Sequence, residues 1–171
     1  MSPPKKSKKP PEISPLEQIH RHLRRKIPPT LAHWPEQAQS WVEDYYANAV
    51  EAQIFEVMLP PAVFLFDSIC DRVMLAYGIA TPALMKRDNS RIRGYANVNA
   101  TVQAALGERA FVADKGHFLG HASGGQLEIN LFAQRRELNR GWSSEGKRFR
   151  EMERYVADHP GTFFYHRPLY E

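Results

Sequence analysis

The 171-residue sequence contains one cysteine, Cys70, and therefore cannot form a disulfide framework. Because Cys70 lies in an apolar segment, we expect a small buried side chain there rather than a catalytic thiol. The chain also lacks an apolar run of the roughly 20 residues that a membrane helix needs. Prolines and charged residues interrupt its longest apolar stretch, residues 59–80, which reads as buried core. The sequence thus predicts no membrane association.

Strong net charge is missing once the N-terminus is set aside. Four lysines in the first nine residues equal the whole formal net charge of +4, so the remainder is close to neutral. The proline, lysine and serine content predicts a disordered tail over residues 1–13. No apolar stretch follows these basic residues, which is not the pattern of a Sec signal peptide. We therefore expect a cytoplasmic protein or one exported by another route.

The pattern of apolar residues is mostly helical over residues 14–80. It predicts one helix over 14–27, with Ser14 as N-cap, and a long amphipathic stretch over 34–59 that ends at Pro60-Pro61. Residues 87–106 and 108–122 contain short β-favouring runs separated by Asn, Gly and Asp, as strands and hairpins do.

From Asn130 the pattern becomes helical again. It includes a helix over 143–159 that Ser143 or Ser144 caps and that Pro160-Gly161 stops. An aromatic-rich final strand follows over 162–170. The order of these elements predicts the α+β class.

The stretch DKGHFLGHASGG, residues 114–125, contains two histidines, His117 and His121, among four glycines. Two histidines four apart bind zinc together on a helix, but the glycines make a helix here improbable. In a strand the two lie roughly 13 Å apart, and the chain has no cysteine pair. The pattern favours instead one histidine at a strand end as a general base, paired with a hard cation such as Mg²⁺.

Oxygen ligands and positive charge follow this stretch. Asn130 and Asn139 lie downstream, and residues 135–154 contain seven Lys or Arg against four Glu. Guanidinium groups bind phosphate bidentately, so this segment suits nucleic acid. The alternative is a solvated helix face with internal ion pairs.

The order of DKGH, HASGG, NLFAQ and ELNRGW resembles the DNA/RNA non-specific endonuclease family, which belongs to the ββα-metal or His-Me finger nucleases. The resemblance covers residues 85–171, about half the chain. It implies a ββα-metal nuclease core over 81–171, with the helical segment 14–80 packed on it as an N-terminal extension.

The resemblance implies that His117 is the general base and that Asn139 is the direct protein ligand of Mg²⁺, with Mn²⁺ as an alternative ion. Asn130 would orient the site or contact the substrate, beside Gln134. Arg91 or Arg93 would bind the scissile phosphate.

The sequence departs from the family's pattern at three points. Lys115 replaces the usual arginine near the scissile phosphate, keeping the charge but losing the bidentate fork. Ala133 stands where the family has proline. The acidic metal-site residue has Glu145 as its nearest counterpart.

Further contacts to nucleic acid are expected from the basic and polar side chains around these motifs, namely Gln134, Arg135, Arg136, Arg140 and His121. For His121 a hydrogen bond inside the loop is the alternative.

The expected activity is metal-dependent endonucleolytic cleavage of DNA, with RNA as a second substrate, leaving 5′-phosphates. Such an activity fits a bacterial toxin or effector with an inhibitor (immunity) protein as partner. The alternatives are a catalytically inactive nucleic-acid-binding module on the same fold, or an interaction protein whose basic helix is only a solvated face.

Overall fold

The computed structural model describes residues 33–87 and 97–169, and the chain divides into two compact units, Met1–Asn48 and Ala49–Glu171. In the first unit the described element is helix α2 (Trp34–Asn48), with the buried Trp34 and Trp41 rings edge-to-face at 5.6 Å. The predicted tail over 1–13 and the predicted helix over 14–27 lie outside the described residues.

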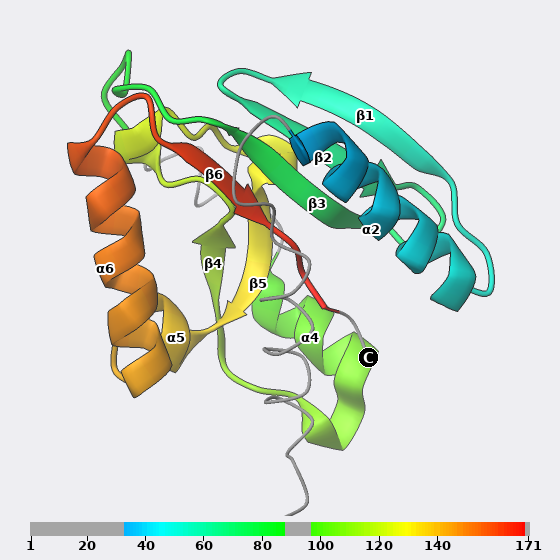
Figure 1. The fold of residues 1–171 in the computed structure, drawn as a ribbon. Coiled ribbons are helices and arrows are strands. Elements are labelled where there is room, and N and C mark those ends of the chain that lie inside the picture. The colour runs from blue at the N-terminus through cyan, green and yellow to red at the C-terminus, as the bar shows by residue number, and fades with distance from the viewer. Residues whose placement is uncertain (1–32, 88–96, 170–171) are drawn as a thin grey trace, which may run out of the picture. The chain divides into compact units, whose positions relative to one another are not determined.

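The second unit contains a four-stranded antiparallel sheet in the order β1-β2-β3-β6 (Figure 1). Its strands are β1 (Ile54–Leu59), β2 (Ala62–Asp67), β3 (Arg72–Ile79) and β6 (Phe163–His166). Strands β3 and β6, which lie on either side of the predicted boundary at residue 80, are hydrogen-bonded neighbours.

The helical interpretation of residues 54–79 is therefore wrong. Pro60 and Pro61 do not end a helix but form the turn that joins β1 to β2. The apolar spacing of this segment fits a helix, but its β-branched and aromatic side chains fill a pleated surface better. Cys70, expected to be buried, is exposed in the turn between β2 and β3.

A two-stranded antiparallel hairpin pairs β4 (Ala113–His117) with β5 (Leu131–Arg135). The connecting loop contains two short 3-10 turns, His121–Ser123 and Glu128–Asn130. Helices α5 (Arg136–Asn139) and α6 (Ser144–Asp158) follow the hairpin, and α4 (Val98–Leu106) with the 3-10 turn Gly107–Arg109 precedes it (Figure 1).

Two local predictions around this hairpin are wrong. Residues 98–106 form a helix rather than strands, because Asn97 accepts hydrogen bonds from the N–H groups of Asn99 and Ala100 as an N-cap. Residues 131–135 form a strand rather than a helix, since their N–H and C=O groups pair with β4.

Other predictions are confirmed. A strand ends at His117, Ser143 caps α6 by accepting from Gly146 N–H, and the chain closes with β6. The mixed α+β class is confirmed as well.

The core of the second unit joins the sheet to the hairpin. Phe118, the residue after His117, stacks on Phe132 of β5 at 4.5 Å and meets Phe64 of β2 edge-on at 6.1 Å. Buried aromatic rings of this size contribute several kcal/mol each. The chain immediately after β4 is therefore anchored in the core.

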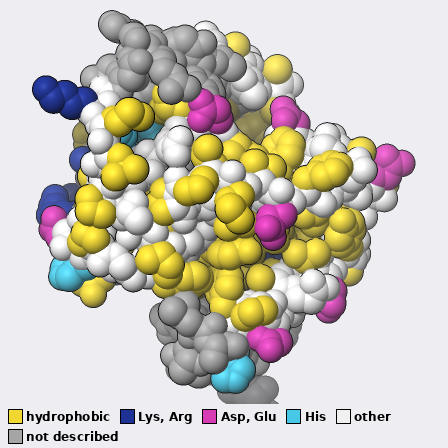
Figure 2. Space-filling view, turned by 90° about the horizontal axis from the view of Figure 1, so that it is seen from above, with side chains coloured by type: hydrophobic (Ala, Val, Ile, Leu, Met, Phe, Trp, Pro, Cys, Tyr) yellow, Lys and Arg dark blue, Asp and Glu magenta, His cyan; other side chains and the backbone are white. Residues whose placement is uncertain are grey.

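Apolar side chains also remain at the surface. Hydrophobic residues cover much of the face seen in Figure 2, and the exposed ones include Phe55 and Met58 of the edge strand β1 and Leu84 and Met85. No helix among residues 33–87 and 97–169 is long and apolar enough to cross a membrane.

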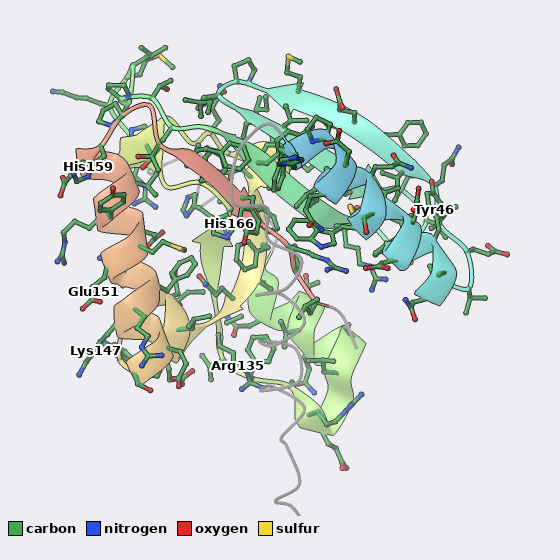
Figure 3. All side chains as sticks on the ribbon, in the orientation of Figure 1. Tyr46, Arg135, Lys147, Glu151, His159 and His166 are labelled. Atoms are coloured by element: carbon green, nitrogen blue, oxygen red, sulfur yellow. The ribbon has the colours of Figure 1, made fainter. Side chains whose placement is uncertain are left out.

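His166 of β6 lies among aromatic rings, edge-on to Phe118 and Phe149 and tilted against Phe164, with ring centroids 6.1–6.3 Å apart (Figure 3). Burial lowers the pKa of its imidazole to about 4, because this apolar environment disfavours the charged form.

We predict that His166→Phe makes stability less sensitive to acid. The unfolded chain binds a proton near pH 6.5 and the folded chain only near pH 4, so stability falls as the pH drops between these values. Chemical denaturation at pH 7 and pH 5 should show that the wild type loses roughly 1–2 kcal/mol more than the variant. His159→Phe, at an exposed position after α6, is the control; an equal acid loss in His166→Phe and wild type would contradict the prediction.

Candidate active site

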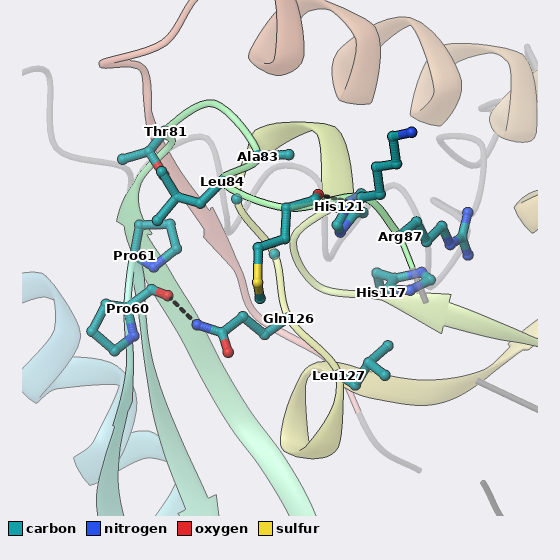
Figure 4. A pocket seen from close by; sticks show the side chains of 14 residues that line it. Pro60, Pro61, Thr81, Ala83, Leu84, Arg87, His117, His121, Gln126 and Leu127 are labelled. Carbon is teal, nitrogen blue, oxygen red and sulfur yellow. Dashed lines mark hydrogen bonds between the residues drawn. The ribbon is translucent and has the colours of Figure 1, made fainter. Parts of the chain in front are cut away.

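A pocket of about 350 Å³ lies at the end of β4. Its walls come from the Pro60-Pro61 turn, the segment 81–87 after β3, and the loop 117–127 after β4 (Figure 4). Basic and imidazole side chains line one side, and proline and leucine side chains line the other. Of the predicted site residues, the pocket contains His117 and His121.

His117 enters the pocket as the last residue of β4, paired with Leu131 of β5. Its Nε2 atom is buried and has no hydrogen-bond partner among the described residues. Burial, with smaller contributions from the positive charges of Arg87 and His121, lowers the pKa of His117 to about 4. The imidazole is therefore neutral at pH 7, with an unused nitrogen that can accept a proton.

Arg87 is the arginine that the structure brings beside His117, and Lys86 lines the same pocket. The predicted phosphate-binding residues Arg91 and Arg93 lie outside the described residues. Reasoning from the sequence missed Arg87 because no motif surrounds it. The one available signal was the adjacent basic pair Lys86-Arg87 directly after an apolar segment.

His121 fastens the segment that carries Arg87. Its Nε2 lies 2.9 Å from the carbonyl oxygen of Met85, and since a carbonyl only accepts, this nitrogen is the donor. A second bond, 3.1 Å from Thr81 N–H to the Ser123 carbonyl, joins the same two segments. His121 therefore acts as a positioning residue, which is the hydrogen-bonding alternative considered for it.

Asn130 holds the loop that follows His117. Its buried side chain accepts from Leu119 N–H at 2.9 Å and donates to the carbonyls of Leu119 at 2.9 Å and Gln126 at 2.6 Å. Because both amide atoms are engaged with backbone, Asn130 orients the loop and has no free edge for substrate.

The glycines of this loop are required by close packing. A Cβ at Gly125 would overlap the carbonyl oxygen of Leu119, and Gly124 has φ +88° with Thr81 and Pro61 against it. A Cβ at Gly116 would lie 2.5 Å from Oε1 of Gln134.

Asp114 fastens the other end of β4 to α5. Its carboxylate accepts hydrogen bonds from Arg136 Nε at 3.1 Å and Arg140 Nε at 2.6 Å. These bonds, Arg140 first, hold the pKa of Asp114 below its usual value. Two arginines expected to bind nucleic acid are thus engaged in an internal ion-pair cluster.

The remaining predicted nucleic-acid contacts occupy varied surroundings. The guanidinium of Arg135 lies over the Phe111 ring at 4.4 Å. Gln134 is only 4% exposed, and its Oε1 is buried without a partner among the described residues, so it offers no surface contact. Lys115 points from β4 and is half-buried.

Of the two predicted metal ligands, Asn139 ends α5, half-buried, and its amide has no hydrogen-bond partner within the described part of the chain. Glu145 is exposed in the first turn of α6, where its own backbone N–H and the hydroxyls of Ser144 and Ser143 lower its carboxyl pKa. Neither residue lines the pocket of His117.

A different glutamate of α6 lies near the loop after β4. A Cβ at Gly120 would meet Glu153 Oε1 at 3.8 Å, and burial raises the pKa of the Glu153 carboxyl. The sequence pattern did not distinguish Glu153 from the other charged residues of this helix.

The donor set constrains which metal these residues fit. Over residues 33–87 and 97–169 no three His, Cys, Asp or Glu side chains are grouped to hold an ion. A single amide oxygen such as that of Asn139 suits an ion that keeps most of its water shell, as Mg²⁺ does. The amide oxygen of Asn139 is therefore a donor of the kind that Mg²⁺ accepts.

No family model, curated protein or solved structure matches the chain.

We predict that Gly125→Ala destabilises the protein strongly and Gly120→Ala does not. The added methyl at residue 125 would overlap the Leu119 backbone, whereas at residue 120 it makes only an ordinary contact. We expect Gly125→Ala to lower the free energy of unfolding by roughly 2–3 kcal/mol and Gly120→Ala by less than about 0.5 kcal/mol. Urea denaturation of the two variants measures both; equal stability would show that the loop is not packed as described.

Proposed function

We propose that this protein is a metal-dependent phosphodiesterase that cleaves DNA, and RNA as a second substrate, with His117 as the general base. The observation that carries the proposal is the buried, unpartnered Nε2 of His117 beside Arg87 in a pocket at a strand end. A base and an anion-binding cation side by side are what hydrolysis of a phosphodiester requires.

The charge of the pocket supports an anionic substrate. Lys86 and Arg87 line it together with two histidines, and no Asp or Glu is among the described residues of its wall. The element order gives further support, since two antiparallel strands with His117 at the end of the first are followed by helices that carry Asn139.

In the proposed reaction the imidazole of His117 removes a proton from a water molecule, and the oxygen of that water attacks phosphorus. The bond from phosphorus to the 3′-oxygen breaks and this oxygen takes a proton from solvent water, leaving a 5′-phosphate and a 3′-hydroxyl. Arg87 and Lys86 hold the phosphate and offset its growing negative charge.

Asn139 is the residue we propose to hold Mg²⁺ through its amide oxygen. When bound, the ion would supply Lewis-acid stabilisation of a phosphate oxygen. Asn139 follows β5 at the end of the hairpin where β4 begins, so the substrate would have to extend from there to His117 at the other end of β4. The Asp114 cluster fixes the helix that ends with Asn139 against β4.

The proposal predicts that supercoiled plasmid and total RNA are cleaved with Mg²⁺ and left intact with EDTA. His117→Ala should lower the cleavage rate by about 10²-fold or more, since that is the typical contribution of a general base. His159→Ala removes an exposed imidazole that stacks on Tyr155, and it should cleave at the wild-type rate.

Full activity of His117→Ala would refute the role of His117. If the wild type cleaves nothing with Mg²⁺ or Mn²⁺ but still retards plasmid in a gel, the protein is a nucleic-acid-binding module instead.

The low pKa of His117 predicts how activity depends on pH. Protonation removes the base, so kcat/KM should stay level above pH 6 and fall only as the pH drops towards about 4. A phosphate bound beside His117 favours the charged imidazole, so the acid limb of kcat should lie at higher pH than that of kcat/KM.

Arg87→Gln tests the contribution of the Arg87 charge to this shift, which is smaller than that of burial. Removing the positive charge should move the acid limb of kcat/KM to higher pH and raise KM, whereas Lys147→Gln on the outer face of α6 should do neither (Figure 3). An acid limb near 6.5 in the wild type would contradict the buried geometry of His117.

A further inference from the structure

The pocket of His117 has a charged side and an apolar side. It is larger than a phosphate group needs. Arg87 and His117 lie on one side, with Leu127 drawn just below His117, and Pro60, Pro61 and Leu84 lie on the opposite side (Figure 4). Its volume of about 350 Å³ falls within the range of small-molecule sites, roughly 300–1,000 Å³. An apolar wall next to a cationic one suits a ligand with both an anionic and a flat apolar part.

Gln126 places an oriented polar group on the apolar side. Its Nε2 donates to the carbonyl oxygen of Pro60 at 2.8 Å, which fixes the amide because a carbonyl cannot donate. The Oε1 atom is therefore left as an acceptor, and the side chain is exposed at the pocket. An acceptor in this place can take a hydrogen bond from a donor on the edge of a planar ring.

The walls of the apolar side are held in place before any ligand binds. Asn130 restrains the backbone of Gln126, because its amide donates to the Gln126 carbonyl. The bonds from His121 to Met85 and from Thr81 to Ser123 hold the segment 81–87, which carries Leu84, against the loop after β4. Gly124 packs against both Thr81 and Pro61. Preformed walls reduce the entropy lost when a flat ligand is immobilised.

We propose that the apolar side of this pocket binds one nucleobase that has left its stack, while Arg87 and Lys86 hold an adjacent phosphate beside His117. This inference rests on the proposed function and names the substrate as single-stranded or locally unpaired nucleic acid. A paired base in a duplex cannot enter a pocket without leaving its stack, whereas a single strand presents bases freely and binds by such contacts. The contact is with the face and a donor edge of the base, so all four bases are accepted.

The test compares two ligands of equal charge in the presence of EDTA, where no cleavage occurs. They are deoxythymidine 3′,5′-bisphosphate and the same bisphosphate of deoxyribose without a base, titrated calorimetrically into the full chain. We expect the nucleotide to bind at least fivefold more tightly, which is the lower range for one stacked base. Equal affinities, or no measurable binding of the nucleotide at millimolar concentration, would overturn the proposal.

Variants locate the binding of the base. Leu127→Ala and Gln126→Ala should each reduce the preference for the nucleotide by at least half, without changing the affinity for the base-free analogue. Gln103→Ala is the matched control, because Gln103 Nε2 also donates to a backbone carbonyl, that of Gly107 at 3.1 Å, but on α4 outside the pocket. A preference that survives in both pocket variants would place the base elsewhere and overturn the proposal.

The result of this binding test can be distinguished from the result of the cleavage test of the proposed function. Cleavage of plasmid with no preference for the nucleotide would leave the nuclease proposal intact and remove the base site. A preference for the nucleotide in a protein that cleaves nothing would keep the base site and remove the catalytic role.

Discussion

The buried amide of Asn130 is the interaction on which the candidate site depends. Its three hydrogen bonds close the loop between β4 and β5 by satisfying backbone groups of Leu119 and Gln126 that would otherwise be buried unpaired. Phe118, locked in the aromatic core, fixes the start of the same loop. His117 precedes this anchored region and Leu127 lies inside it, so the loop that Asn130 holds carries residues that line the pocket.

The two ends of β4 carry different charged groups, which stabilise the fold at one end and line the candidate site at the other. At the start of the strand, Asp114 engages the guanidinium groups of Arg136 and Arg140, which fastens α5 to the hairpin. At its end, His117 meets Arg87 with no carboxylate among the described residues of the pocket wall. In the first cluster a single carboxylate binds both guanidinium groups and fastens α5 to the hairpin. At the strand end, no carboxylate of the described pocket wall offsets the positive charge of Arg87.

Sequence patterns succeeded where the decisive interaction is local. Ser143 caps α6 through Gly146, three residues away, and the glycines around His117 indicated a strand end and a loop. They failed at residues 98–106, where the local N-cap Asn97 starts a helix, and where pairing with other strands decides the conformation. Residues 54–79 carry spacing compatible with a helix but form β1 to β3, since each strand gains its partners from the next one and from β6. Residues 131–135 became a strand for the same reason, through pairing with β4.

The sequence by itself determined the α+β class, the ends of α6 and the candidacy of His117 as a base. Those properties follow from capping, glycine placement and the chemistry of imidazole, all of which act within a few residues. Only the tertiary structure decided that Arg87 lies beside His117 and that the Asn130 amide is fully hydrogen-bonded to the loop backbone. It also decided that apolar side chains line the same pocket as His117. The contacts of Arg87 and of the apolar wall depend on segments 30 to 66 residues apart in the chain meeting at the end of one strand, as His121 with Met85 and Gln126 with Pro60 do. The burial of His117 and the electrostatic potential around it arise from these tertiary contacts, so they cannot be read from any short stretch of sequence.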